Sequence, residues 1–482
     1  MLFNSYVFIL LFLPIFVIGY FALNKFNNKM AIIFIIMASA IFYLYGGINI
    51  SIILGVSIVF NYVMALVIQL NIKKKRIFLG IVIIVNILLL LYFKYFNFLV
   101  EILNEKFTLN YSIKELWLPL GISFFTFQQI MYVVSVYRKE LEKVDLAEYL
   151  AYILFFPKLI MGPLVEPKTF IVQLNDKDKK CVCWDNVIAG LRLFSYGLFK
   201  KMIFADTFSK AVAWGFNNIN DTTSGDLFLV MLFYTFEIYF DFSGYTDMAV
   251  GISKMINISF PMNFNSPYKA FSIRDFWKRW HMSLTMFLTK YIYYPLGGNR
   301  KGIARTYINI LIVFLLSGFW HGANWTFILW GMIYGLLQIV ERILEKVYDK
   351  IFDVVKWGYT FLTINLLWLL FRAESVSQWK LLIVKMFSFQ NMSISEGLIN
   401  SFVVPESEFL FNILNLTGVN ESVRGFGMLS FIVFAFIICF IPDNNYKTMH
   451  RLNLGEAFFS AFAFVWAFLC LSNESVFVYF NF

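Results

Sequence analysis

The chain has 482 residues, of which 60% are hydrophobic and only 15% are charged. Soluble domains are about 45–50% apolar and about 25% charged, so the composition excludes an ordinary soluble protein. It also excludes a disordered or collagen-like chain. The net charge of +10 does not indicate nucleic-acid binding, because the basic residues stand in short clusters between apolar runs. We therefore expect a polytopic membrane protein that is surrounded by lipid and binds no nucleic acid.

The sequence offers little for metal or nucleotide chemistry. Cys181 and Cys183 have the wrong spacing for a zinc knuckle, and no histidine lies near them. With three histidines in the whole chain, we expect no metal site. No Walker loop or dinucleotide fingerprint is visible, and no internal repeat indicates a transporter built from two related halves.

Four membrane-crossing helices are predicted in the first hundred residues. The first apolar run, residues 5–23, is too long for a signal-peptide core and lacks a basic segment before it, so we expect it to be retained. Basic residues follow the first helix (Lys25, Lys29) and the third (residues 73–76). The positive-inside rule places these loops in the cytoplasm and the N-terminus outside. The other three runs are residues 31–47, 51–70 and 77–100.

The same alternation predicts the rest of the topology. Residues 149–164 contain Pro157 and Pro163, so we expect a re-entrant segment packed inside protein. With the remaining apolar runs the total is about twelve crossings, which places the C-terminus outside. We expect one transmembrane domain over residues 1–482, with an extracytoplasmic loop at 373–425 and an aromatic extracytoplasmic tail at 472–482. The later crossings are expected at residues 118–137, 187–208, 226–250, 303–320, 324–341, 357–372, 426–441 and 456–472.

Two carboxylates, Asp241 and Asp247, stand in an otherwise apolar helix together with Ser243 and Tyr245. A charge near the bilayer centre costs at least about 2.5–3.5 kcal/mol, so such residues face a cavity or a partner. The alternative is a hydrogen-bond network that packs one helix against another.

A second polar stretch includes Asn265 and the segment from Arg274 to His281. Arg274, Trp277 and His281 are spaced to share one face of a helix, and Lys278 lies one turn after Arg274. The alternative is an interfacial amphipathic helix with basic side chains reaching the headgroups. That alternative accounts less well for the histidine.

His321 follows Trp320 and precedes Gly322 at the end of another apolar helix. A histidine between glycines can be approached closely by backbone or ligand. An imidazole can take a proton from a hydroxyl near neutral pH, so His321 is a candidate general base. The alternative is a histidine that only packs among tryptophans.

Taken together, the motifs resemble the membrane-bound O-acyltransferase superfamily, and within it the bacterial alginate and peptidoglycan O-acetyltransferase branch. The resemblance runs nearly end to end, and Lys158 departs from it where a histidine or similar polar residue is expected. The motifs that carry it are residues 2–5, 118–128, 155–157, 162–163, 197–201, 239–247, 263–268, 274–281 and 320–323.

The resemblance implies an all-α fold of transmembrane, re-entrant and interfacial helices around a tunnel, in the bacterial cytoplasmic membrane. It implies that His321 is the catalytic base and His281 its companion. Such proteins move acetyl from cytoplasmic acetyl-CoA to an exported or cell-wall polysaccharide, with an extracytoplasmic partner of the SGNH-esterase type. The cationic segment suits the phosphates of coenzyme A, and an N–H of His281 or Trp280 suits the developing oxyanion. The expected acetyl-CoA-binding residues are Arg274, Trp277, Lys278 and Arg279; the expected supporting residues are Asp241, Ser243, Tyr245, Asp247, Asn265, Trp280 and Trp320.

The tail ends in Phe477-Val478-Tyr479-Phe480-Asn481-Phe482. An aromatic tail at the membrane interface is the simpler interpretation. Related bacterial systems use a C-terminal tyrosine motif as an acyl carrier, which makes Tyr479 a candidate acceptor activated by His321. Two rival functions stay open at this point: acylation of lipid or protein, or D-alanyl transfer to teichoic acid, within the same superfamily, and a proton-coupled transporter that uses the carboxylates and histidines as a relay.

Overall fold

The computed structural model describes residues 1–70, 73–107, 111–114, 116, 118–143, 145–402, 404, 421–451, 453–471 and 477. Every regular element in these residues is a helix. The helices are η1 (Phe8–Phe12), α1 (Leu13–Asn24), α2 (Asn28–Leu44), α3 (Ile48–Leu70), α4 (Lys75–Leu90), η2 (Leu91–Tyr95), α5 (Phe96–Phe107), α6 (Ile122–Tyr137), α7 (Leu146–Leu154), α8 (Phe156–Leu159), α9 (Pro167–Asn175), η3 (Lys177–Lys179), α10 (Trp184–Phe199), η4 (Lys200–Ala205), α11 (Asp206–Asn217), α12 (Ser224–Met255), η5 (Pro267–Lys269), α13 (Ile273–Arg279), α14 (Met282–Leu288), η6 (Thr289–Tyr293), α15 (Ile303–His321), α16 (Trp325–Ile343), α17 (Glu345–Tyr348), α18 (Asp353–Arg372), α19 (Val376–Met386), α20 (Glu396–Ser401), α22 (Glu421–Phe440), α23 (Asn445–Thr448) and α24 (Leu454–Leu469).

The predicted crossings all fall on helices. Within the described residues, seven helices are long and apolar enough to cross a membrane, and four shorter apolar helices accompany them. The predicted crossing at 187–208 falls on the continuous run of α10, η4 and α11. The outer faces of these helices expose many large apolar side chains, as expected for contact with lipid. The prediction of an all-α polytopic membrane protein is therefore confirmed.

The segment predicted to be re-entrant is broken and buried. α7 ends before Phe155, and the four-residue helix α8 follows. Phe155 and Phe156 have no exposed surface, and the Phe156 N–H donates to Ser39 Oγ at 3.2 Å. The Lys158 ammonium is also buried, where it donates to Gln128 Oε1 and lies 3.8 Å from the Tyr152 ring centroid. Irregular backbone at this depth is thus enclosed by protein.

Hydrogen bonds and ion pairs join the loops that were predicted to share the cytoplasmic side. Gln69 Nε2 donates to the Glu142 carbonyl at 3.1 Å, and Asn28 Nδ2 donates to Asn175 Oδ1 at 3.4 Å. Arg192 in α10 donates to the Thr448 carbonyl at 2.8 Å. The predicted outer loops contact one another in the same way, since Asn324 Nδ2 donates to the Glu374 carbonyl and Lys385 Nζ to the Ile219 carbonyl. These contacts agree with the predicted alternation of the helices. Residues 403 and 405–420 of the predicted extracytoplasmic loop lie outside the described residues.

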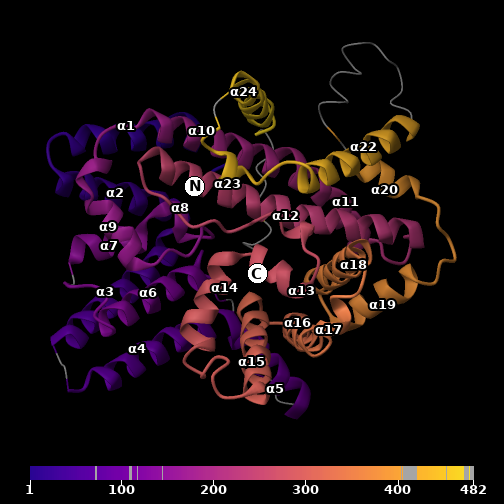
Figure 1. Ribbon diagram of the computed structural model, residues 1–482, viewed down its shortest axis with the longest axis horizontal. Helices are drawn as coiled ribbons and strands as arrows, with labels where there is room; N and C mark the ends of the chain where they lie inside the picture. Colours follow the sequence, from indigo (N-terminus) through magenta and orange to yellow (C-terminus); the bar gives the residue numbers. More distant parts are fainter. Residues whose placement is uncertain are drawn as a thin grey trace.

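α12 crosses the centre of the body and is fixed to α10 and η4 (Figure 1). The backbones touch where Gly197 faces Gly244, because a Cβ on Gly197 would lie 2.5 Å from the Gly244 carbonyl oxygen. One turn later Lys201 Nζ lies 2.7 Å from Asp241 Oδ1 and 2.9 Å from Asp206 Oδ1.

The second carboxylate of α12 is paired as well. Lys200 Nζ lies 2.7 Å from Asp247 Oδ2, and Asn445 Nδ2 donates to the same oxygen at 3.1 Å. Asp241 and Asp247 thus take part in polar contacts that pack one helix against another, which is the alternative that the sequence analysis left open. A proton relay through them would require breaking the buried Lys201–Asp241 pair and the partly buried Lys200–Asp247 pair, which disfavours the transporter.

The topology predicts which cysteines a membrane-impermeant maleimide reaches in intact cells. Cys181 and Cys183 are exposed and follow the lysine-rich η3, so we expect no labelling of them until the cells are permeabilised. The exposed Gln390, on the predicted outer side, provides the control. Gln390→Cys, in a chain whose native cysteines are serine, should label in intact cells. Labelling of Cys181 or Cys183 in intact cells would contradict the orientation.

Candidate active site

His321 is the last residue of α15, and close contact with α16 fixes it there. A Cβ on Gly318 would lie 2.2 Å from the Phe327 carbonyl oxygen, and one on Gly331 would lie 2.4 Å from the Phe314 carbonyl oxygen. Gly322 is needed for a similar reason, since its Cβ would lie 2.1 Å from the Phe327 ring. The glycines around His321 therefore serve helix packing, as small residues do where membrane helices approach closely.

Two side chains of η2 hold the carbonyls at the end of α15. Lys94 Nζ donates to the carbonyl oxygens of Trp320 and His321, each at 2.7 Å. The Tyr95 hydroxyl donates to the Phe319 carbonyl, and its ring stacks on the Phe319 ring with centroids 4.1 Å apart. The last carbonyls of a helix have no partner within it, and a cation there also interacts favourably with the helix dipole.

Aromatic rings surround the His321 imidazole. Its centroid lies 4.8 Å from the Trp320 ring, 5.2 Å from Trp330 and 5.0 Å from Phe371. His321 is 3% exposed. These contacts alone would fit the alternative of a histidine that only packs among tryptophans. His321, however, also lines a cavity.

This cavity, which we call the histidine cavity, encloses about 100 Å³. Leu118, which is 37% exposed, lies at its rim in a segment predicted to be extracytoplasmic. The histidine cavity thus includes both His321 and a partly exposed residue from the predicted outer side. The residues that line the cavity are Lys94, Leu118, Pro119, Leu120, Gly121, Ile122, Ser123, Phe124, Ile160, Met161, Trp320 and His321.

The helix predicted to carry Arg274, Trp277 and His281 on one face is interrupted, which corrects that prediction. α13 ends at Arg279, and His281 has left-handed backbone angles (φ 44°, ψ 51°) at the start of α14. Asn263 causes the break. Its carbonyl accepts from the Met282 N–H at 2.9 Å, and its side-chain Oδ1 accepts from the Ser283 N–H at 3.2 Å. Hydrogen bonds from a distant loop therefore replace those that would continue the helix.

The break directs His281 toward the same region as His321. The Trp320 ring contacts both imidazoles, with centroids 6.1 Å from His281 and 4.8 Å from His321. His281 Nδ1 lies 3.2 Å from Asn263 Oδ1. Because that amide oxygen accepts from Ser283, we assign the hydrogen of the neutral imidazole to Nδ1. His281 Nε2 is buried, has no hydrogen-bond partner among the described residues, and then carries a lone pair.

This tautomer revises the expected source of the oxyanion N–H. The neutral His281 ring presents an acceptor, not a donor. Trp280, the other expected donor, packs against Trp368 with centroids 4.9 Å apart. Trp368 in turn contacts Trp330, and Trp330 contacts His321, so this series of contacts places two rings between Trp280 and His321. The Trp320 Nε1–H and the Trp330 Nε1–H are both buried without a partner in the described residues, and both rings contact His321. They are the nearer N–H donors.

A second cavity, which we call the basic cavity, lies beside α13 and encloses about 270 Å³. Arg274, Trp277 and Lys278 line it, together with Arg342. Its lining includes Ser317, one turn before His321 in α15. Trp277 also contacts Trp330, the neighbour of His321, with centroids 5.5 Å apart. The basic cavity therefore reaches from the predicted cytoplasmic loops toward the histidine pair.

Arg279 does not line the basic cavity in the described structure. Its Nε lies 2.9 Å from Asp275 Oδ1, and its NH1 donates to the Asn265 carbonyl at 3.4 Å. Asn265 in turn donates its backbone N–H to the Arg279 carbonyl at 2.9 Å. The hydrogen bonds between Arg279 and Asn265 connect α13 to the loop before it.

Ser243, another of the expected supporting residues, is buried in α12.

Two carboxylates bind the start of α13, one in the last turn of α16 and one on the first residue of α17. The Glu341 carboxylate accepts from the backbone N–H groups of Ile273 and Arg274, at 2.7 and 3.0 Å. Arg274 NH1 lies 2.8 Å from Glu345 Oε1, and this bond lowers the pKa of the Glu345 carboxyl below its ordinary value. Arg274 is thus oriented at the mouth of the basic cavity by a partner that a phosphate can replace.

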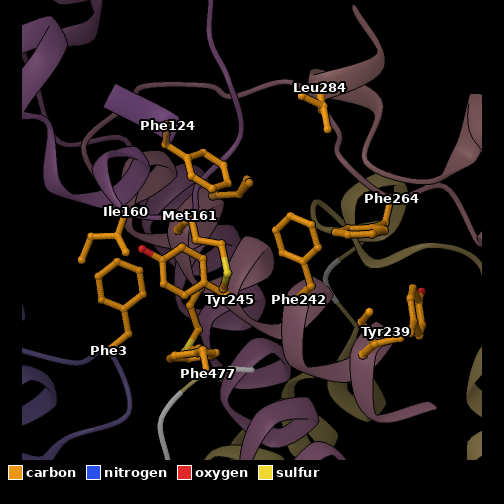
Figure 2. Close-up of a cluster of buried hydrophobic side chains, with 14 of the residues drawn as sticks. Phe3, Phe124, Ile160, Met161, Tyr239, Phe242, Tyr245, Phe264, Leu284 and Phe477 are labelled. Atoms are coloured by element: carbon orange, nitrogen blue, oxygen red, sulfur yellow. The ribbon is translucent and has the colours of Figure 1, made fainter. Parts of the chain in front are cut away.

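Of the predicted C-terminal tail, the structure describes Phe477, which lies inside the body. Phe477 has no exposed surface and meets the Tyr245 ring edge-on, with centroids 5.1 Å apart. Lys201 Nζ lies 4.5 Å from the Phe477 ring centroid. Figure 2 shows Phe477 and Phe3 on two sides of Tyr245, with Met161 beside it. Met161 also lines the histidine cavity. Tyr479 lies outside the described residues.

Three residues at this site were missed in the sequence. Lys94 was detectable as a lone charge in an apolar run, which is costly unless it has a function. Asn263 lies in the 263–268 motif, but nothing in the sequence distinguishes it from its neighbours there. Glu341 looks like an ordinary charged residue at a helix end. Within the described ranges, no group of three His, Cys, Asp or Glu side chains lies close enough to hold a metal ion.

Comparison with known proteins gives one family. The profile of the MBOAT, membrane-bound O-acyltransferase family matches residues 78–373. A peptidoglycan O-acetyltransferase of Helicobacter pylori is 34% identical over 100% of this chain and 98% of its own length. A protein of Pseudomonas aeruginosa named as a probable alginate O-acetylase is 36% identical over 90% of this chain and 81% of its own. A teichoic acid D-alanyltransferase of Bacillus subtilis is 29% identical over 45% of this chain and 58% of its own.

The glycine contacts predict a matched pair of variants. Gly318→Ala places a methyl against the Phe327 carbonyl and should separate α15 from α16, which displaces His321. We expect a loss of about 1–3 kcal/mol in stability and of about 100-fold in activity. Gly358→Ala in α18 meets nothing within 4 Å and should be neutral or stabilising. Thermal unfolding in detergent and acyl-transfer rates compare the two. Equal behaviour of both variants would show that the close approach does not position His321.

Proposed function

Because the chain belongs to the membrane-bound O-acyltransferase family and is an O-acyltransferase, we propose that it transfers acetyl from cytoplasmic acetyl-CoA across the bacterial cytoplasmic membrane to a polysaccharide outside. The relatives that match most of its length are named for acetylation of peptidoglycan and alginate. The D-alanyltransferases match less than half of the chain, so acetyl is the favoured acyl group. Both termini then lie outside the cytoplasm.

One observation carries the proposal: two cavities approach the histidine pair from opposite predicted sides of the membrane. The histidine cavity contains His321 itself. The lining of the basic cavity includes Ser317, one helical turn before His321. It also includes Trp277, whose ring contacts Trp330, and Trp330 contacts His321. A donor and an acceptor can therefore meet at one imidazole without a path for water between the two compartments.

The basic cavity suits acetyl-CoA. Arg274, Lys278 and Arg342 stand among its lining residues, where guanidinium and ammonium groups bind phosphates. Its inner walls are apolar and aromatic, which suits the pantetheine arm. The arm would bring the thioester toward Trp277 and Trp320.

The chemistry needs a base and donors for the oxyanion. His321 takes the proton of the attacking hydroxyl as the oxygen bonds to the thioester carbonyl carbon. The carbon–sulfur bond then breaks, and the departing thiolate receives that proton from the imidazolium. Trp320 Nε1–H can donate to the carbonyl oxygen.

We propose Tyr479 as the first acceptor. Phe477, two residues before it, is buried against Tyr245, and Met161, which lines the histidine cavity, lies beside Tyr245 (Figure 2). The burial of Phe477 supports this proposal. The tyrosyl ester would pass acetyl to an extracytoplasmic SGNH-type partner, whose own specificity selects the polysaccharide.

Substitutions at His321 and Tyr479 separate the two halves of this proposal. Tyr479→Phe removes the acceptor oxygen, so surface acetylation should disappear at unchanged protein level. His321→Ala removes the base, so no acetyl should appear on the C-terminal peptide. Mass spectrometry of that peptide and of cell-wall polysaccharide measures both results. Normal acetylation by folded His321→Ala protein would refute the function, while normal acetylation by Tyr479→Phe would refute only the relay.

The basic cavity predicts a change in donor affinity. Lys278→Gln removes a cation from its lining, and we expect KM for acetyl-CoA to rise about tenfold to 100-fold, the range of a hydrogen bond to a charged group. Lys350→Gln is the control, because that lysine is exposed on the same predicted side and does not line the cavity. Steady-state kinetics in proteoliposomes give both values. A KM that changes equally in both variants would place coenzyme A elsewhere.

A further inference from the structure

Lys94 lies in η2, within a continuous helical run from Lys75 to Phe107 that is long enough to cross a membrane. No other charged residue stands between Arg76 and Glu101. A charge at such a position is costly in a membrane helix and is seldom kept without a function.

Lys94 and Lys158 are buried lysines whose hydrogen bonds go to neutral oxygens, and of the two only Lys94 lines the histidine cavity. Lys200 and Lys201 are each paired with carboxylates, and Lys290 lies 2.8 Å from Glu166. Lys94 is within ion-pair distance of no carboxylate in the described part of the chain; its hydrogen bonds go to two neutral carbonyls. The charge of its ammonium is therefore uncompensated there.

Lys94 also faces the reaction site. Of the described residues that line the histidine cavity, it alone is charged. An ammonium has three N–H groups, and the carbonyls of Trp320 and His321 occupy two of them. Capping α15 explains those two bonds, and the helix dipole favours a cation there, but neither accounts for the third N–H group of an ammonium that lines the cavity.

We propose that Lys94 forms an anion subsite that stabilises the negative oxygen of the tetrahedral intermediate during acetyl transfer at His321. This inference rests on the proposed function. As the hydroxyl oxygen bonds to the carbonyl carbon, the carbonyl π electrons move to its oxygen, which becomes anionic. The fixed ammonium and the Trp320 N–H stabilise that charge until the carbonyl reforms and the thiolate leaves. Lys94 keeps its proton throughout. A preorganised cation in a site that excludes water is effective in this role.

The test compares Lys94→Gln with Lys94→Arg and Tyr95→Phe in proteoliposomes of the full chain. Lys94→Gln keeps a donor for the carbonyls and removes the charge, and Lys94→Arg keeps the charge. Tyr95→Phe removes a neighbouring cap bond, to Phe319, and no charge. The readout is the rate of coenzyme A release in a single turnover at increasing acetyl-CoA, which gives a plateau rate and a half-saturating concentration. Lys94→Met is a second neutral variant should the glutamine variant not fold.

We expect Lys94→Gln to lower the plateau rate by about 100-fold or more with a half-saturating concentration within about twofold of the wild type. Lys94→Arg and Tyr95→Phe should stay within about tenfold of the wild-type plateau. A plateau unaffected by Lys94→Gln would overturn the proposal, and so would an equal loss in Tyr95→Phe or Lys94→Arg, which would assign the lysine to helix capping. His321→Ala, assayed in parallel, keeps the outcomes distinct, because undiminished release by that variant refutes the proposed function itself.

Discussion

The hydrogen bonds that Lys94 donates to the last carbonyls of α15 are the constraint on which the position of His321 depends, and Tyr95 adds one more to the same helix end. A helix end inside a membrane leaves carbonyl groups that lipid cannot satisfy, so α15 can stop at His321 only where protein supplies donors. Once α15 stops there, Gly322 turns away, and α16 returns along Gly318 and Gly331. The imidazole is then held at a fixed depth, at the boundary of a cavity.

A second interrupted helix completes the arrangement. The turn between α13 and α14 exists because Asn263 satisfies the backbone at its start, and it places His281 beside the Trp320 ring that also contacts His321. Both histidines thus stand at helix ends, where backbone direction changes and side chains can converge. The ion pairs of Lys200 and Lys201 fix α12 against η4.

Hydropathy was sufficient to predict the apolar helices, because a bilayer imposes a length rule on each segment separately. The side of the membrane assigned from the basic clusters stays a prediction. The two histidines were also found, since a polar residue in an apolar run is conspicuous. The break at His281 was not predictable from periodicity, because its cause is a hydrogen bond from Asn263 eighteen positions earlier. For the same reason the pairing of Asp241 with Lys201, and of Lys94 with the α15 carbonyls, became evident only in three dimensions.

The central claim is that a thioester from one side of the membrane meets a hydroxyl from the other at His321. The most direct measurement is a cryo-electron microscopy structure with a thioether analogue of acetyl-CoA that cannot transfer its acyl group. We predict phosphates at Arg274 and Lys278, the arm along Trp277, and the analogue carbonyl within about 3.5 Å of the Trp320 N–H or the His321 imidazole. An analogue bound with its carbonyl remote from both histidines would contradict the account.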